Sequence, residues 1–148
     1  MKILIPLILF LFALTIHAAP SKKSCSYYGE VEREYRCGSE GYPVKFGYRL
    51  CEKYRVAEPT MPAAVKTWFP KIRYCLQRYL ENQRGSIRDC EDLHRKAINS
   101  HIGCYVATGF CDLGFMDQAA ILQVTSTDIF NADILALSFR VQAACALR

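Results

Sequence analysis

All eight cysteines of this 148-residue chain lie beyond residue 24, and the segment before them resembles an export signal. Residues 1–18 carry an early positive charge at Lys2, an apolar run over 3–14 and a small residue at Ala18. This pattern is typical of a cleaved secretory signal peptide and is too short for a stable membrane anchor. Because exported thiols oxidise, an even number of cysteines predicts a disulfide framework. We therefore expect a secreted, extracellular protein with four disulfides and no free thiol, whose pairing the cysteine count leaves open.

The residues that follow the signal suffice for one domain. A segment of about 130 residues can bury a single sizeable core, so we expect one domain over 19–148. The stretch Ser21–Gly41 is polar and interrupted by glycines, which predicts an arm or loop. We assign 25–50 to this disulfide-pinned arm and 51–145 to a helical core.

The hydrophobic period beyond Pro43 is helical. Val44, Tyr48 and Cys51 indicate a short helix. A longer helix is expected to start at Thr60 or Pro62, because apolar residues then recur every three or four positions. These residues are Val65, Trp68, Phe69, Ile72, Cys75, Leu76, Tyr79 and Leu80. Pro70 lies inside the pattern and predicts a kink or a break.

A second long helix follows the turn at 82–86. Ser86 is the expected N-terminal cap, and Gly109 is expected to end the helix. Its expected buried face comprises Ile87, Cys90, Leu93, Ala97, His101 and Cys104, with Ile98 and Ile102 beside it. Its polar residues, expected to lie largely off that face, are Asp89, Glu91, Asp92, Arg95 and Lys96.

Two further helices are expected near the C-terminus. Asp117 is a candidate cap for a short helix over 112–124, and Asp128 or Asn131 is expected to open the last helix. The expected buried side of the last helix comprises Ile134, Leu135, Leu137, Phe139, Val141 and Cys145. Convincing strand-like alternation is absent from the sequence. We therefore predict an all-α, disulfide-stapled domain of about four to five helices.

A metal site is the first chemistry to consider, because Cys90 and His94 are four residues apart and His101 and Cys104 are three apart. Each pair could chelate zinc on a helix face. His94 and His101, however, would lie about 10.5 Å apart along the helix axis, too far to share one tetrahedral ion. The cysteines are also expected to oxidise. We therefore expect no metal site.

Catalysis has no better support in the sequence. A catalytic thiol needs an unpaired cysteine beside a base, and the even count leaves none to spare. No HExxH, no GxSxG and no phosphate-binding glycine loop occurs. We therefore expect a protein that is not an enzyme, with no catalytic residue and no cofactor.

Positive charge is concentrated in the middle of the chain, where 45–96 holds twelve Lys and Arg against six Asp and Glu. This excess is too small to indicate nucleic acid, but it could bind a sulfated glycan on an extracellular surface. The alternative is an ordinary solvated helix face. The candidate strip comprises Lys71, Arg73, Arg78, Arg84 and Arg88.

The cysteine spacing from Cys51 to Cys145 is the most specific pattern in the sequence. It runs Cys51-x23-Cys75-x14-Cys90-x13-Cys104-x6-Cys111-x33-Cys145, and "QVTSTDIFN" precedes the last expected helix. This arrangement resembles the core of the stanniocalcin family, which are secreted helical regulatory proteins. The resemblance covers 95 residues, with low identity between the cysteines.

The resemblance implies a disulfide pairing. It joins Cys75 to Cys104, Cys111 to Cys145, and Cys90 to an early cysteine, best Cys37, which leaves Cys25 with Cys51. A simple hairpin turning near Gly85 would instead place Cys75 opposite residue 95. The Cys75–Cys104 bridge therefore requires a kink, for example at Pro70, or an oblique helix crossing.

The sequence also departs from the family. The family has a denser N-terminal cysteine cluster and a further cysteine, beyond the last core cysteine, that links two chains. This sequence has neither, so we expect no covalent dimer, but a monomer or a non-covalent dimer paired through the Val65–Leu80 stripe.

By resemblance, the expected function is that of a hormone-like, non-enzymatic secreted regulator. Such proteins act in calcium and phosphate homeostasis or inhibit an extracellular metalloproteinase of the pappalysin type. The expected partner is an extracellular protein, either a receptor or a secreted protease, with no nucleic acid and no membrane insertion.

One alternative is a secreted α-helical carrier of a small apolar ligand, with a cavity lined by the nine Tyr and eight Phe, although such residues more often form core. Another is a secreted effector that acts on a host.

Overall fold

The computed structural model describes residues 17–125 and 132–148, and these residues form helices and no strand. The all-α prediction is therefore confirmed. The helices are α1 (Tyr27–Tyr35), α2 (Arg49–Ala57), α3 (Ala63–Gln83), α4 (Cys90–Ala107), α5 (Phe115–Val124) and α6 (Ala132–Ala146). A π-helical segment, Pro43–Tyr48, leads directly into α2, and short 3₁₀ turns lie at Glu58–Thr60, Arg84–Ser86 and Phe110–Asp112.

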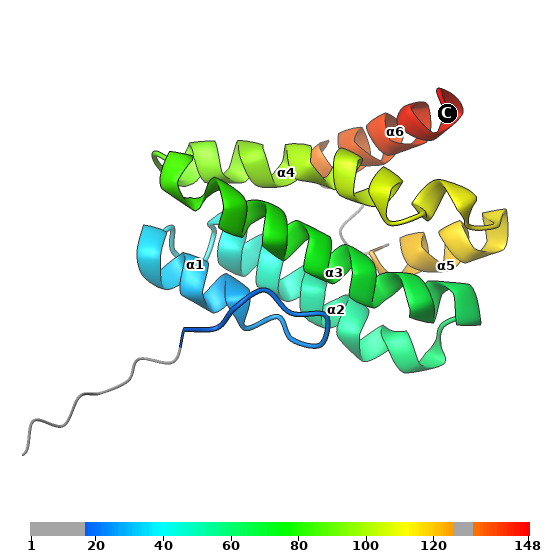
Figure 1. Ribbon diagram of the computed structural model, residues 1–148, viewed down its shortest axis with the longest axis horizontal. Helices are drawn as coiled ribbons and strands as arrows, with labels where there is room; N and C mark the ends of the chain where they lie inside the picture. Colours follow the sequence, from blue (N-terminus) through cyan, green and yellow to red (C-terminus); the bar gives the residue numbers. More distant parts are fainter. Residues whose placement is uncertain (1–16, 126–131) are drawn as a thin grey trace, which may run out of the picture.

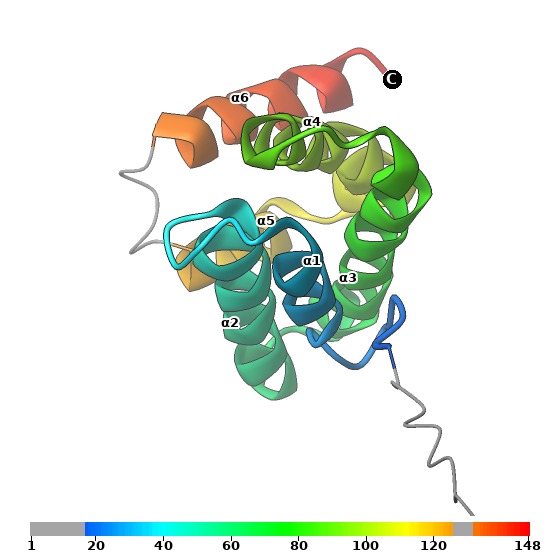
Figure 2. The same ribbon diagram turned by 90° about the vertical axis from the view of Figure 1, so that its left-hand side faces the viewer.

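The helices form two groups that α3 connects. Figure 2 shows α4 and α6 side by side in one group and α1, α2 and α5 in the other. α3 runs between the groups, alongside α2 at one end and towards α4 at the other (Figure 1). The hydrophobic core bridges the two groups, since one buried cluster joins α1 to α4 and the second joins α3, α5 and α6.

The prediction of an arm or loop over 21–41 is wrong for the middle of this stretch, because the chain forms α1 there. Tyr27, Tyr28 and Val31 of α1 are all buried, so this helix contributes to the core. A side chain at Gly47 would clash with the ring of Tyr28, because its Cβ would lie 2.4 Å from a ring carbon. Gly47 therefore allows α1 to pack directly on the π-helical segment. The short helix predicted from Val44, Tyr48 and Cys51 is present as this segment and α2, with Val44 and Tyr48 exposed.

Helix α3 carries the predicted apolar stripe without a break. Val65, Trp68, Phe69, Ile72 and Leu80 are buried, while the other members of the stripe are half-buried. Pro70 lies inside this continuous helix, and neither the predicted break nor a second helix is present. Burial of the stripe on both sides of Pro70 offsets the roughly 3 kcal/mol cost of an internal proline. Because the stripe is buried within the chain, it is not available to pair with a second copy, contrary to our expectation.

Helix α4 begins at Cys90, not at the predicted Ser86, and Asp89 is its cap. The Asp89 carboxylate accepts a hydrogen bond from the backbone N–H of Asp92 at 2.7 Å. Asp92, predicted to lie off the buried face, is itself buried and forms an ion pair with Lys96 at 3.0 Å. Gly109, with φ of 89°, follows the end of α4 as predicted.

Helix α5 differs from prediction in its start, and helix α6 differs in its buried side. Gly114 precedes the first residue of α5, so Asp117 is not its cap. The candidate caps Asp128 and Asn131 lie outside the described residues, as does most of the expected signal peptide. In α6 only Leu137 and Val141 are buried.

Four disulfides staple these elements, and no free cysteine remains. They are Cys25–Cys51, Cys37–Cys90, Cys75–Cys104 and Cys111–Cys145, with Cα–Cα distances of 5.9, 5.6, 5.7 and 5.3 Å. These are the four pairs that the resemblance implies. Cys75 reaches Cys104 without a break at Pro70, because α4 begins late and crosses α3 obliquely (Figure 1).

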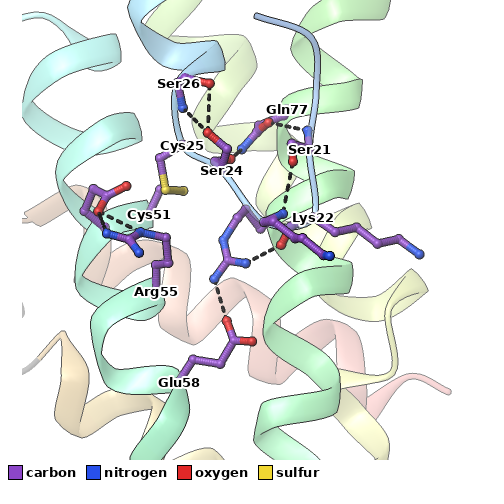
Figure 3. Close-up of a disulfide and its surroundings, with 12 residues drawn as sticks. Ser21, Lys22, Ser24, Cys25, Ser26, Cys51, Arg55, Glu58 and Gln77 are labelled. Carbon is purple, nitrogen blue, oxygen red and sulfur yellow. Dashed lines mark hydrogen bonds and ion pairs between the residues drawn. A yellow bond between two sulfur atoms is a disulfide. The ribbon is translucent and has the colours of Figure 1, made fainter.

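The segment before α1 lies across α3 and is held by buried side chains. Gln77, which is fully buried, accepts from the backbone N–H of Ser21 and donates to the carbonyl of Ser24, both at 2.8 Å. The Cys25–Cys51 disulfide anchors the same segment to α2 (Figure 3). Together these contacts fasten the N-terminal segment to both helices.

Candidate functional site

Each of the helices α1 to α6 contributes to an apolar cavity of about 220 Å³, α1 through Tyr28 alone. Its lining is mostly aromatic and aliphatic. An apolar cavity of roughly 150 Å³ is enough to hold benzene in an engineered protein. A molecule somewhat larger than a single aromatic ring would therefore fit here.

Helical periodicity places the lining side chains. Residues three and four positions apart share a face of a helix, and each helix turns one such set towards the cavity. These sets are Phe69, Ile72 and Leu76 on α3, Ile98, His101 and Tyr105 on α4, and Leu135, Ser138 and Gln142 on α6. The cavity therefore lies where apolar faces of several helices meet.

Aromatic rings in contact form one wall of the cavity. The ring of Tyr54 lies 4.9 Å from that of Phe69, and the ring of Tyr105 lies 5.0 Å from that of Phe110, measured between centroids. Contacts at such distances hold ring orientations. This wall therefore has a defined shape.

Three of the apolar side chains that line the cavity are also exposed to solvent. Leu122 is 39% exposed, Leu135 45% and Phe139 68%. Sequence periodicity placed Leu135 and Phe139 in the core, and this prediction is wrong. Since all three also line the cavity, they mark its mouth between α5 and α6. The mouth thus has an apolar rim.

The polar groups of the cavity carry little net charge. Burial raises the pKa of Tyr28, Tyr42 and Tyr105 above its ordinary value, so these hydroxyls stay neutral at physiological pH. Arg73 also borders the cavity, but its guanidinium is paired with Glu58 at 2.8 Å and donates to the Lys22 carbonyl. The site therefore favours a neutral, mostly apolar occupant.

His101 is a further polar side chain that lines the cavity. Its Nδ1 lies 2.8 Å from the Ala97 carbonyl, one turn back on α4. Burial lowers the pKa of its imidazole, which favours the neutral ring. Sequence reasoning placed His101 on the buried face of its helix, but no sequence signal indicated that a cavity would lie beside it.

The two histidines considered for zinc lie at different sites. His94 borders a separate, open groove about two turns earlier on α4, where its Nε2 is 3.2 Å from Asp133. The rings of Tyr42 and Phe46 pack against His94. Among the described residues, no group of His, Cys, Asp and Glu is placed to hold a metal ion. Cys90 in the same groove is disulfide-bonded and so is not a nucleophile.

The structure does not assemble the predicted basic strip. Arg73 is buried between α3 and the N-terminal segment, so it cannot belong to a surface strip. Arg84 pairs with Glu34 and Glu81, and Arg88 with Asp92. In the part of the chain that the structure describes, Lys71 and Arg78 are the two of the five that are exposed and form no ion pair.

Comparison with protein families, with curated proteins and with solved structures finds no match to this chain. Over residues 17–125 and 132–148, no helix is both long and apolar enough to span a membrane. Four disulfides fit an extracellular protein.

Proposed function

We propose that this chain is a secreted, non-enzymatic protein that carries a small apolar ligand in the cavity between α2 and α6. The observation that supports this proposal is an apolar cavity of about 220 Å³ whose mouth is lined by exposed Leu122, Leu135 and Phe139. Concave, mostly apolar sites with few polar groups are the usual form of small-molecule pockets. Exposed apolar side chains at such a mouth lower the free-energy barrier for an apolar ligand that passes from water into the cavity.

The disulfides support the proposal because they fix the walls. Cys75–Cys104 joins α3 to α4, and Cys111–Cys145 joins α6 to the turn before α5. All four of these elements contribute to or adjoin the cavity. A preformed site loses less conformational entropy on binding, which favours affinity for a small ligand.

A titration with a neutral fluorescent probe of two fused rings, 2-aminonaphthalene, tests the proposal on the oxidised mature protein. A carrier is expected to show a blue-shifted, saturable signal near one probe per chain. Because misfolded protein also binds such probes, the thermal unfolding midpoint should rise with probe concentration. The absence of both effects would rule out this function.

Two variants on α6 sharpen the test. Ser138 lines the cavity, so Ser138→Phe is expected to fill it and weaken probe binding by about tenfold or more. Ala136 is exposed on the same helix and does not line the cavity, so Ala136→Phe should bind the probe as the wild type does. Equal affinity in the two variants would place the probe elsewhere.

A second candidate function is a stanniocalcin-like regulator of extracellular proteins. It is favoured by one observation, namely that the four disulfides have the pairing implied by the resemblance. The test is inhibition of a purified pappalysin-type metalloproteinase by the oxidised protein. A regulator of this kind is expected to inhibit at near-stoichiometric concentration, whereas a carrier leaves the protease active.

A further inference from the structure

We propose that His101 selects for ligands that carry a neutral hydroxyl group, such as a small alcohol or phenol, over pure hydrocarbons and carboxylates. This inference rests on the proposed carrier function and names the ligand class of the same cavity. It follows from which nitrogen of the His101 imidazole carries the proton and from the balance of the charges that border the cavity.

The hydrogen bond of Nδ1 determines the tautomer of His101. The Ala97 carbonyl, 2.8 Å from Nδ1, can only accept, so Nδ1 carries the proton and donates it. Because the ring is neutral, Nε2 then carries a lone pair. The cavity is therefore bordered by a histidine that presents a hydrogen-bond acceptor.

Within residues 17–125 and 132–148, no group donates a hydrogen bond to this acceptor. The hydrogen bonds of the ring go to backbone carbonyls of α4, at Ala97 and Ile98, and Nδ1 makes the one to Ala97. Nε2 is the ring nitrogen that the Ala97 bond leaves unused. Because His101 lines the cavity, an occupant can supply the missing proton donor.

The hydroxyl groups of two other side chains that line the cavity already donate hydrogen bonds within the protein. Ser138 donates to the Ile134 carbonyl at 2.9 Å, and Thr125 donates to the Leu122 carbonyl at 3.1 Å. Neither hydroxyl competes for His101. A ligand hydroxyl would therefore meet an unused acceptor in an apolar setting, where a buried hydrogen bond is stronger than in water.

The charges near the cavity argue against an acidic ligand. Arg73 is the cation that borders it, and Glu58 already balances its charge. A carboxylate could accept a hydrogen bond from Arg73 Nε, which is buried without a partner among the described residues, but Glu58 already balances the guanidinium charge. The added negative charge would therefore be unbalanced in an apolar site, and its burial is strongly unfavourable. A carboxylate would also meet the lone pair of His101. A neutral hydroxyl avoids each of these costs.

The experiment compares three probes with the same ring system: 2-naphthol, naphthalene and 2-naphthoate. Affinities are measured by titration calorimetry or by probe displacement on the oxidised mature chain. Comparing affinity ratios between wild type and variants cancels the different hydration of the probes. In His101→Leu, the naphthol-to-naphthalene affinity ratio is expected to fall by about 2- to 10-fold, the range of one neutral hydrogen bond. His101→Gln keeps an acceptor near the position of Nε2 and should retain most of the ratio.

His94→Leu is the matched control, because His94 lies on the same helix but outside the cavity. The naphthol-to-naphthalene affinity ratio of this variant should equal that of the wild type. A ¹⁵N spectrum of the wild type adds a readout that needs no variant: naphthol should shift Nε2 of His101, and naphthalene should not. Failure of every probe to bind would overturn the carrier function itself. Binding with an unchanged ratio in His101→Leu, or with naphthoate preferred, would overturn the role of His101 and leave the carrier function standing.

Discussion

Arg73 reaches from α3 to Glu58, with 2.8 Å between Nη2 and the carboxylate, and only 4% of the arginine side chain is exposed. The same guanidinium donates to the Lys22 carbonyl, so one buried side chain links α3, the end of α2 and the N-terminal segment. A residue that the charge pattern assigned to a surface strip is thus a structural anchor.

We expect Glu58→Ala to lower the free energy of unfolding by about 1.5–3 kcal/mol, because it leaves the buried Arg73 without its charged acceptor. The control is Glu52→Ala, which removes an exposed pair with Arg55. That change should cost less than about 1 kcal/mol. Urea unfolding measures both, and equal losses would contradict the anchoring role of Arg73.

The cap of α4 can be tested with two substitutions. Asp89→Ala removes the hydrogen bond to the Asp92 N–H and is expected to cost about 1 kcal/mol. Ser86→Ala changes an exposed residue outside the helix and should cost no more than about 0.5 kcal/mol. Thermal or urea unfolding would decide between them, and a larger effect at Ser86 would restore the sequence-based assignment of the cap.

The Cys111–Cys145 bridge is expected to contribute to stability and to ligand binding. Replacing both cysteines with alanine should lower stability by about 2–4 kcal/mol, chiefly because the unfolded chain gains freedom. Because α6 forms part of the cavity wall and mouth, probe affinity should also fall. Unfolding and probe titration on the same preparation test both effects. Undiminished probe affinity would show that α6 holds its place without the bridge.

His101 should make stability depend on pH. Burial holds the pKa of folded His101 below its ordinary value of 6.5, so near and below that pH the unfolded chain binds a proton that the folded chain does not. The contribution of neutral His101 to the free energy of unfolding is therefore fully present above about pH 7. It is lost as the pH falls through 6.5 towards the folded pKa. His101→Gln should flatten the slope of unfolding free energy between about pH 7 and 5. Asn99→Gln, at an exposed site on the same helix, should leave it unchanged.

The remaining basic residues are expected to behave as solvated charges. Lys71→Ala combined with Arg78→Ala should reduce retention on heparin and on a cation exchanger of equal charge density to the same extent. Any retention should be lost as salt rises, since the screening length falls to about 3 Å at 1 M salt. Stronger retention by heparin, abolished in this double variant, would instead support a glycan site.

The sequence by itself was sufficient for the local features. The period of the apolar residues in Val65–Leu80 predicted the long helix α3, and Gly109 marked the end of α4. These features depend on residues three or four positions apart along the chain, so the spacing of residue types in the sequence is enough to predict them. The all-α class followed from the same periods.

Burial and contact between distant segments were decided only by the tertiary structure. α1 forms in a polar segment because Tyr27, Tyr28 and Val31 find partners outside their own neighbourhood, and tertiary packing overrides weak local propensity. Phe139 follows the apolar pattern of α6 but stays exposed, because the neighbouring helices cover the face of Leu137 and Val141 instead. The cavity beside His101 exists only where helices α1 to α6 do not fill the space between them, and no single segment of the sequence encodes that space. Periodicity reports which residues share a face of a helix, whereas the packing angles of the helices decide what that face meets.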